Sequence, residues 1–303
     1  MSRRLIGALA FALAIGAPPT LPAQPAVAPD AAATGAFLNI SPRRVSLDRA
    51  RRNATVILLN QGTEPVTVDV ALVDRVMLPD GQISTIEEAA TREDVRTAVA
   101  ALKSARDLVQ VSPRRTTLIP GRPQTVRVRL SNLPEGVGDE HRTHLTVTTL
   151  PPRDSGATAE AAASGATAAG LSFQISAVYG VSIPVIVRSS PTEARATLTT
   201  PRLEMVDIPA DGRSSARRVA VAAFEIVREG PGSLYGNLEI HVAGARQGAE
   251  PLGLARGVGV YPEVARRAVR IPLTRAPNPG ERLEVTFTDD DMSPGKVLAK
   301  AAF

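Results

Sequence analysis

The clearest pattern in the chain is an alternation of apolar and polar residues between Leu171 and Arg188. The apolar or aromatic residues take the odd positions: Leu171, Phe173, Ile175, Ala177, Tyr179, Val181, Ile183, Val185 and Val187. A period of two predicts a β-strand with one apolar face. At roughly 3.3 Å per residue this stretch would span about 55 Å, whereas a usual strand has about 5–6 residues.

Two interpretations of this long stretch are open from the pattern alone. In the first, the chain bends or breaks at Gly180 into two ordinary strands, each covered within its own domain. In the second, the strand carries more apolar side chains than its domain covers and keeps an exposed edge. Because the unpaired N–H and C=O groups of an edge recruit other chains, the second interpretation predicts strand addition to a partner.

Shorter alternating segments fill most of the remaining chain after Phe37. Turn residues such as Asn60-Gln61-Gly62 separate them, and a short Ser/Pro-containing linker divides them into two groups. This spacing predicts an all-β fold of two immunoglobulin-like β-sandwich domains in tandem, over residues 37–188 and 195–303.

Two segments interrupt the strand pattern of the first domain. Residues 84–108 open with Ser84 and Glu87 at capping-box spacing and predict one helical insertion of about five turns, whose simplest role is to close one end of the sandwich. Residues 151–170 consist mainly of Ala, Gly, Ser and Thr without an apolar pattern, and they predict a flexible loop directly before the long strand.

The first residues have the pattern of a secretory signal. Arg3 and Arg4 precede the apolar run Leu5–Ala17, which is shorter than the roughly 20 residues of a membrane-spanning helix. We therefore expect a signal peptide over residues 1–23, a Pro/Ala-rich flexible lead-in over 24–36, and export without membrane insertion.

Composition excludes several kinds of chemistry. The 303 residues include no cysteine, so disulfides and thiolate metal sites are absent. The net charge is +5, but the basic residues are spread along the chain and aromatics make up only 3%, which argues against nucleic-acid binding.

Candidate catalytic and metal-binding groups are equally sparse. His141 and His144 are three residues apart on an expected strand and would point to opposite faces, so we expect no metal site there. Asp289–Asp291 has no motif around it, and we expect a solvated turn. Because no nucleophile elbow or P-loop occurs, the sequence predicts a protein that is not an enzyme and needs no cofactor.

Four segments together resemble the periplasmic pilus (fimbrial) assembly chaperones, in a diverged, long-loop form: Ile40–Gly62, Val111–Val128, Asp139–Val147 and Tyr179–Arg188. The C-terminal block resembles this family more weakly. The resemblance implies a periplasmic protein whose two domains form a boomerang. It also implies that the protein stabilises pilin-like subunits by lending them its last N-domain strand, and that it delivers them to an outer-membrane usher.

The resemblance also implies particular site residues. The donor side chains would be Phe173, Ile175, Ala177 and Tyr179. The subunit's terminal carboxylate would be held by Arg44, and the position where the family has a lysine is occupied here by Pro184. Arg188 is a second candidate for that missing base.

Other functions are compatible with tandem sandwiches. One alternative is a structural or adhesive protein of the cell envelope that has no subunit clients. An enzyme or carbohydrate binder is another, although the scarcity of aromatics argues against sugar stacking. Pairing of two exposed donor edges into a self-capped dimer is a further alternative.

Overall fold

The computed structural model describes residues 38–133, 136, 138–151, 178–210, 215–246 and 248–303. The expected signal peptide and lead-in, most of the 151–170 loop, and the donor residues Phe173, Ile175 and Ala177 lie outside the described residues. No helix within the described part of the chain is long and apolar enough to cross a membrane.

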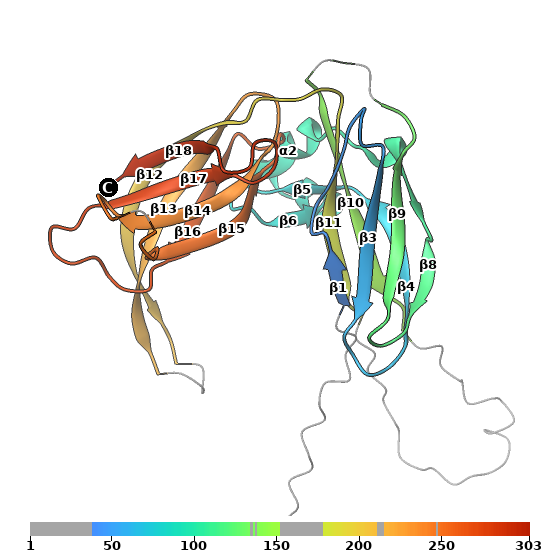
Figure 1. Cartoon of the computed structure of the whole chain (residues 1–303), viewed down its shortest axis with the longest axis horizontal. Helices are drawn as coiled ribbons and strands as arrows, with labels where there is room; N and C mark the ends of the chain where they lie inside the picture. Colours follow the sequence, from blue (N-terminus) through green and yellow to red (C-terminus); the bar gives the residue numbers. More distant parts are fainter. Residues whose placement is uncertain (1–37, 134–135, 137, 152–177, 211–214, 247) are drawn as a thin grey trace, which may run out of the picture. The chain divides into compact units, whose positions relative to one another are not determined.

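The N-terminal residues form two sheets that face each other (Figure 1). The first has the order β1-β3-β9-β7, from Leu38–Ser41, Asn53–Asn60, Pro123–Leu130 and Val109–Ser112. The second has the order β2-β11-β10-β4-β8, from Val45–Leu47, Gly180–Arg188, Glu140–Thr149, Val66–Val73 and Arg115–Leu118.

Alternating side chains build the core between these two sheets. On β3 and β9 every second residue is buried, including Val56, Leu58, Val126 and Val128. On β11 the odd positions Ile183, Val185 and Val187 enter the same core, as the alternation predicts.

The C-terminal residues form a second pair of sheets (Figure 1). One has the order β12-β13-β16, from Arg195–Ile208, Arg217–Glu229 and Arg266–Pro272. The other has the order β15-β14-β17-β18, from Gly253–Val260, Leu234–Val242, Leu283–Asp289 and Val297–Ala302. The predicted all-β fold with two sandwiches is therefore confirmed.

The predicted single long helix over residues 84–108 is wrong. A short hairpin of β5 Arg75–Met77 and β6 Ile83–Thr85 leads into the segment. Four short helical pieces follow: α1 Ile86–Ala90, η1 Glu93–Val95, α2 Arg96–Ala101 and η2 Arg106–Leu108. The capping box is Thr85 with Glu88, one residue later than expected. The Thr91 hydroxyl donates to the Glu88 carbonyl, which competes with continuation of α1.

The insertion packs mainly against the C-terminal core, but its last part, with the buried Ala105 and the partly buried Leu108, packs against the N-terminal core. Its buried residues Ala89, Val95 and Ala98 belong to the cluster that contains Phe224 and Phe287. The segment follows the surface of that core and not a single helix axis, and it therefore forms several short helices in place of one long one.

Candidate functional site

Strand register places a row of polar side chains on the outer face of the β2-β11-β10 part of the sheet. Arg188 lies opposite Glu140, and Pro184 lies opposite His144. Val185 pairs in parallel with Val45, the first residue of β2. Arg44 directly precedes Val45 and therefore lies beside Pro184. Residues that are cross-strand neighbours share a face, so this row turns away from the N-terminal core.

Arg188 is bonded at each nitrogen of its guanidinium and its side chain is 4% exposed. Nε donates to Glu140 Oε2 at 2.9 Å, and Nη2 donates to Asp291 Oδ2 at 2.6 Å and to Ser233 Oγ at 3.1 Å. Nη1 lies 3.0 Å from Met292 Sδ. Although burial alone would lower the pKa of Arg188, the charges of Glu140 and Asp291 raise it above its ordinary value.

Arg44 reaches the same carboxylate but leaves donors unused. Its Nη2 donates to Asp291 Oδ2 at 2.8 Å and to Ser233 Oγ at 3.1 Å, and the guanidinium lies 4.6 Å from the centre of the Tyr235 ring. The side chain is 9% exposed, yet Nε and Nη1 have no hydrogen-bond partner among the described residues. An almost fully buried cation with free donors is suited to receive an additional acceptor.

Asp291 is presented by a tight turn between β17 and β18. The neighbouring Asp289 carboxylate fixes this turn by accepting hydrogen bonds from the backbone N–H groups of Asp291 and Ser293 at 3.2 Å and 2.6 Å. Burial tends to raise the pKa of Asp291, but the positive charge of Arg44 and the hydrogen bond and charge of Arg188 outweigh it and lower the pKa. Asp291 is therefore an anion held between two arginines.

A second ion pair on the same face, Arg142 with Glu263, is almost fully buried. Arg142 Nη2 bonds to Glu263 Oε1, and the two side chains are 2% and 1% exposed. Arg142 also lies 4.1 Å from the centre of the Tyr261 ring, and Glu263 Oε1 accepts from the Met77 N–H at 3.0 Å. His144 lies beside Arg142, where burial and the positive charges of Arg142 and Arg75 lower its pKa to about 2.

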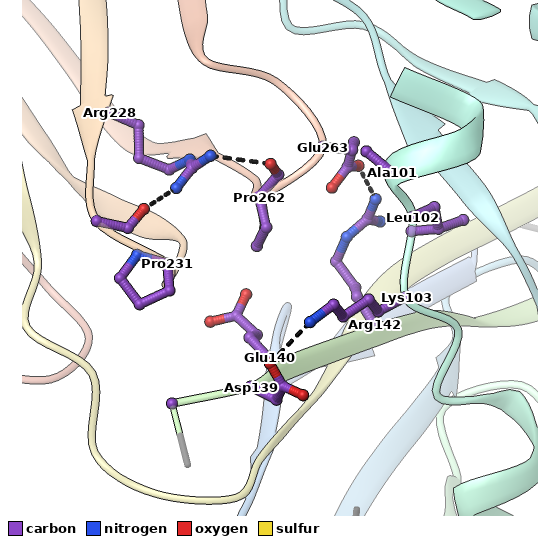
Figure 2. A pocket seen from close by; sticks show the side chains of 12 residues that line it. Ala101, Leu102, Lys103, Asp139, Glu140, Arg142, Arg228, Pro231, Pro262 and Glu263 are labelled. Atoms are coloured by element: carbon purple, nitrogen blue, oxygen red, sulfur yellow. Dashed lines mark hydrogen bonds and ion pairs between the residues drawn. The ribbon is translucent and has the colours of Figure 1, made fainter. Parts of the chain in front are cut away.

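A cavity of about 260 Å³ lies next to this buried pair (Figure 2). Three basic residues, Lys103, Arg142 and Arg228, line it together with three acidic ones, Asp139, Glu140 and Glu263. Arg228 donates to the backbone carbonyl of Pro262 at 2.9 Å, and Lys103 pairs with Asp139 at 2.7 Å. Because these charges balance and are largely paired with each other, the cavity does not select an ion of either sign.

Strand β11 has an open edge next to Arg44. It pairs with β10 over its whole length, but β2 accompanies it only from Val185 to Val187. Within the described residues no strand lies along Gly180–Pro184 on that side. Arg44 lies where this open edge meets the start of β2. The unpaired backbone N–H and C=O groups of the edge are therefore next to a cation.

The structure brings together both predicted anchor residues, Arg44 and Arg188, on one carboxylate. Of the predicted donor residues it describes only Tyr179, whose backbone bonds to Thr149 and which is 43% exposed as a residue. His141 and His144 are on one strand but separated, and no group in the described ranges with three or more His, Asp or Glu could hold a metal ion.

The expectation that Asp289–Asp291 is a solvated turn is wrong for two of the three residues. Asp289 is buried and Asp291 is mostly buried, whereas Asp290 is exposed. Sequence reasoning also missed Glu140, Glu263 and Tyr261. For Asp289–Asp291 the sequence did hold a signal of burial, because this run continues the alternating strand β17. If the strand period continues through it, only the middle residue, Asp290, points to solvent.

Comparison with known proteins gives a likeness of fold. No family model matches the chain, and no curated protein matches it. Among solved structures it is similar to the YadV chaperone (13% identity, TM-score 0.42, covering 88% of this chain and 99% of that one). It is also similar to the chaperone DraB of E. coli (13%, 0.40, 88% and 98%) and the CupB2 chaperone of Pseudomonas aeruginosa (12%, 0.41, 88% and 97%).

The proteins in these three structures are chaperones. Because the TM-scores are below 0.5, this likeness by itself carries no argument about function. The proposed function rests on the residues of this chain.

Proposed function

We propose that the protein is a periplasmic chaperone that binds pilin-like subunits by strand addition and delivers them for pilus assembly at an outer-membrane usher. In this proposal residues 1–23 direct export, and no chemical reaction or cofactor is involved. The observation that carries the proposal is the open edge of β11 at Gly180–Pro184 with Arg44 at its end.

Strand direction links the edge to the cation. A client strand that runs parallel to β11 along this edge follows the direction of β2, so its C-terminal end arrives at Arg44. A guanidinium binds a terminal carboxylate well, in bidentate fashion. An antiparallel strand would bring its N-terminal ammonium group there and would be repelled. Arg44 therefore favours clients that end in a free carboxylate.

The predicted donor residues precede this edge in the sequence. Phe173, Ile175, Ala177 and Tyr179 share the parity of Ile183 and Val185, which point into the N-terminal core. In the proposal they fill the open hydrophobic groove of the subunit. Burial of the larger ones contributes about 1.5–3 kcal/mol each before the cost of ordering the segment.

Co-expression with a pilin-like subunit encoded beside an usher tests the proposal. The subunit should accumulate and co-purify with the wild-type protein, and Ile175→Asp should abolish recovery because a carboxylate cannot enter an apolar groove. Ser176→Asp is the matched control, since it adds the same charge at the opposite parity and should retain the complex. Equal accumulation of the subunit without this protein would contradict the proposal.

A further inference from the structure

Arg44, to which the proposed function assigns the client carboxylate, is bonded to a carboxylate of its own chain. Arg44 Nη2 donates to Asp291 Oδ2 at 2.8 Å and to Ser233 Oγ at 3.1 Å. Both hydrogens of Nη2 are therefore used in hydrogen bonds. A guanidinium grips a carboxylate bidentately through one of two forks, Nε with Nη2 or Nη1 with Nη2. Both forks include Nη2, and an incoming carboxylate cannot bind in this way until Asp291 releases it.

The remaining contacts of the cluster do not depend on Asp291. Arg188 keeps its bonds to Glu140 and Ser233, and the Glu140 carboxylate also accepts from the Ser233 N–H at 3.1 Å. The turn that carries Asp291 is fixed by the Asp289 carboxylate.

Asp291 is also the most accessible charged side chain of the cluster. Its side chain is 12% exposed, compared with 9% for Arg44, 4% for Arg188 and 0% for Glu140. A ligand that approaches from solvent therefore meets Asp291 and Arg44 first, and the buried Arg188–Glu140 pair stays behind them.

We propose that Asp291 is a built-in competitor that occupies Arg44 until a client carboxylate displaces it, and that it thereby sets which ligands Arg44 accepts. The inference rests on the proposed function for the assignment of Arg44 to clients. Its consequence is selectivity. A carboxylate that docks alone competes poorly with a tethered one, whereas a carboxylate at the end of a strand already paired with β11 is held at high local concentration and displaces Asp291.

Acetate is a suitable probe because it tests Arg44 without any client. The Nε–Hε signal of Arg44 in the full chain is followed by NMR during titration with sodium acetate at constant ionic strength. Asp291→Asn should lower the acetate concentration at half-saturation by about tenfold or more, since it removes the competing charge with little change of shape. Asp290→Asn removes the same charge from the exposed neighbour and should titrate like the wild type.

Equal half-saturation in the wild type and Asp291→Asn would overturn the inference, as would the absence of an acetate response at Arg44 in Asp291→Asn. Far-UV circular dichroism checks that the variant is folded. If Asp291→Asn does not fold, Asp291→Ser supplies a second test, with a hydroxyl that can still bond to its neighbours and no competing charge. The same criterion of tighter acetate binding applies to it.

Client recovery separates this inference from the proposed function. If Asp291→Asn binds acetate more tightly while the subunit accumulates equally well without this protein, the competition stands and the chaperone function fails. If Ile175→Asp abolishes recovery while Asp291→Asn leaves acetate binding unchanged, the function stands and the competition fails.

Discussion

Two arginines on one face of the same sheet, Arg142 and Arg44, have opposite environments. Arg142 is paired with Glu263, with both side chains almost fully buried, and the pair is covered by Tyr261. Arg44 shares its carboxylate partner with Arg188 and keeps two nitrogens without a partner in the described part of the chain. In the described residues Arg142 leaves only Nε without a hydrogen-bond partner, whereas Arg44 leaves both Nε and Nη1.

We expect this difference to separate a pair that stabilises the fold from a residue that binds a ligand. Arg142 connects β10 to Glu263 and, through the Arg75 carbonyl, to the hairpin β5-β6, so its bonds hold segments distant in sequence together. Arg44 stands at the open edge of β11 and beside an aspartate that solvent reaches. Substitutions at the first pair should change stability, and substitutions at the second should change binding.

The largest expected effect is that of Glu263→Gln. The substitution leaves the Arg142 charge buried without its counterion, which typically costs about 3–5 kcal/mol of unfolding free energy. Urea denaturation measures this loss, and the conservative shape of Gln keeps the acceptor for the Met77 N–H. Glu239→Gln on the exposed surface is the control and should show no measurable change. Equal stability of both variants would show that the Arg142–Glu263 pair does not stabilise the fold.

His144 provides a pH-dependent test of the same pair. Its pKa in the folded protein is about 2 instead of the ordinary 6.5, because burial and the nearby arginine charges disfavour the imidazolium. The unfolded chain therefore takes up a proton below about pH 6.5 that the folded protein refuses, so stability falls as the pH decreases. At pH 4.5 this costs about 2–3 kcal/mol relative to neutral pH.

His144→Gln should remove this part of the pH dependence. The unfolding free energy of the variant, measured in urea between pH 7 and pH 4.5, should fall less than that of the wild type by roughly the same amount. An identical slope for both proteins would mean that water or a shift of Arg142 allows His144 to become charged in the folded state.

The alternation of the sequence predicted most of the strands and the N-terminal core. It predicted that Ile183, Val185 and Val187 face one side, because a strand's own period determines this without knowledge of its neighbours. The alternation is weak in strands β15 and β18. The glycines of G-L-A-R-G-V-G-V and the alanines of V-L-A-K-A-A weaken the apolar signal, and these segments become strands by pairing with β14 and β17.

The site was predictable only in part, for a related reason. The resemblance pointed to Arg44 and Arg188, but their shared partner Asp291 follows Arg188 by more than one hundred residues. Likewise Glu263 reaches Arg142 from another sheet pair, and the helical segment broke because it follows the C-terminal core. Contacts between segments so distant depend on tertiary packing, which local periodicity does not encode.

The smallest effect on stability is expected for Lys103→Ala. This variant tests whether an ion pair must be buried, as Arg142–Glu263 is, to stabilise the fold. Lys103 pairs with Asp139 at 2.7 Å on the rim of the cavity that Arg142 also lines, but the two side chains are 53% and 37% exposed. Water and salt screen such a pair, so the urea midpoint should not change measurably. A loss as large as that of Glu263→Gln would mean that the cavity rim, and not the buried pair, joins these segments.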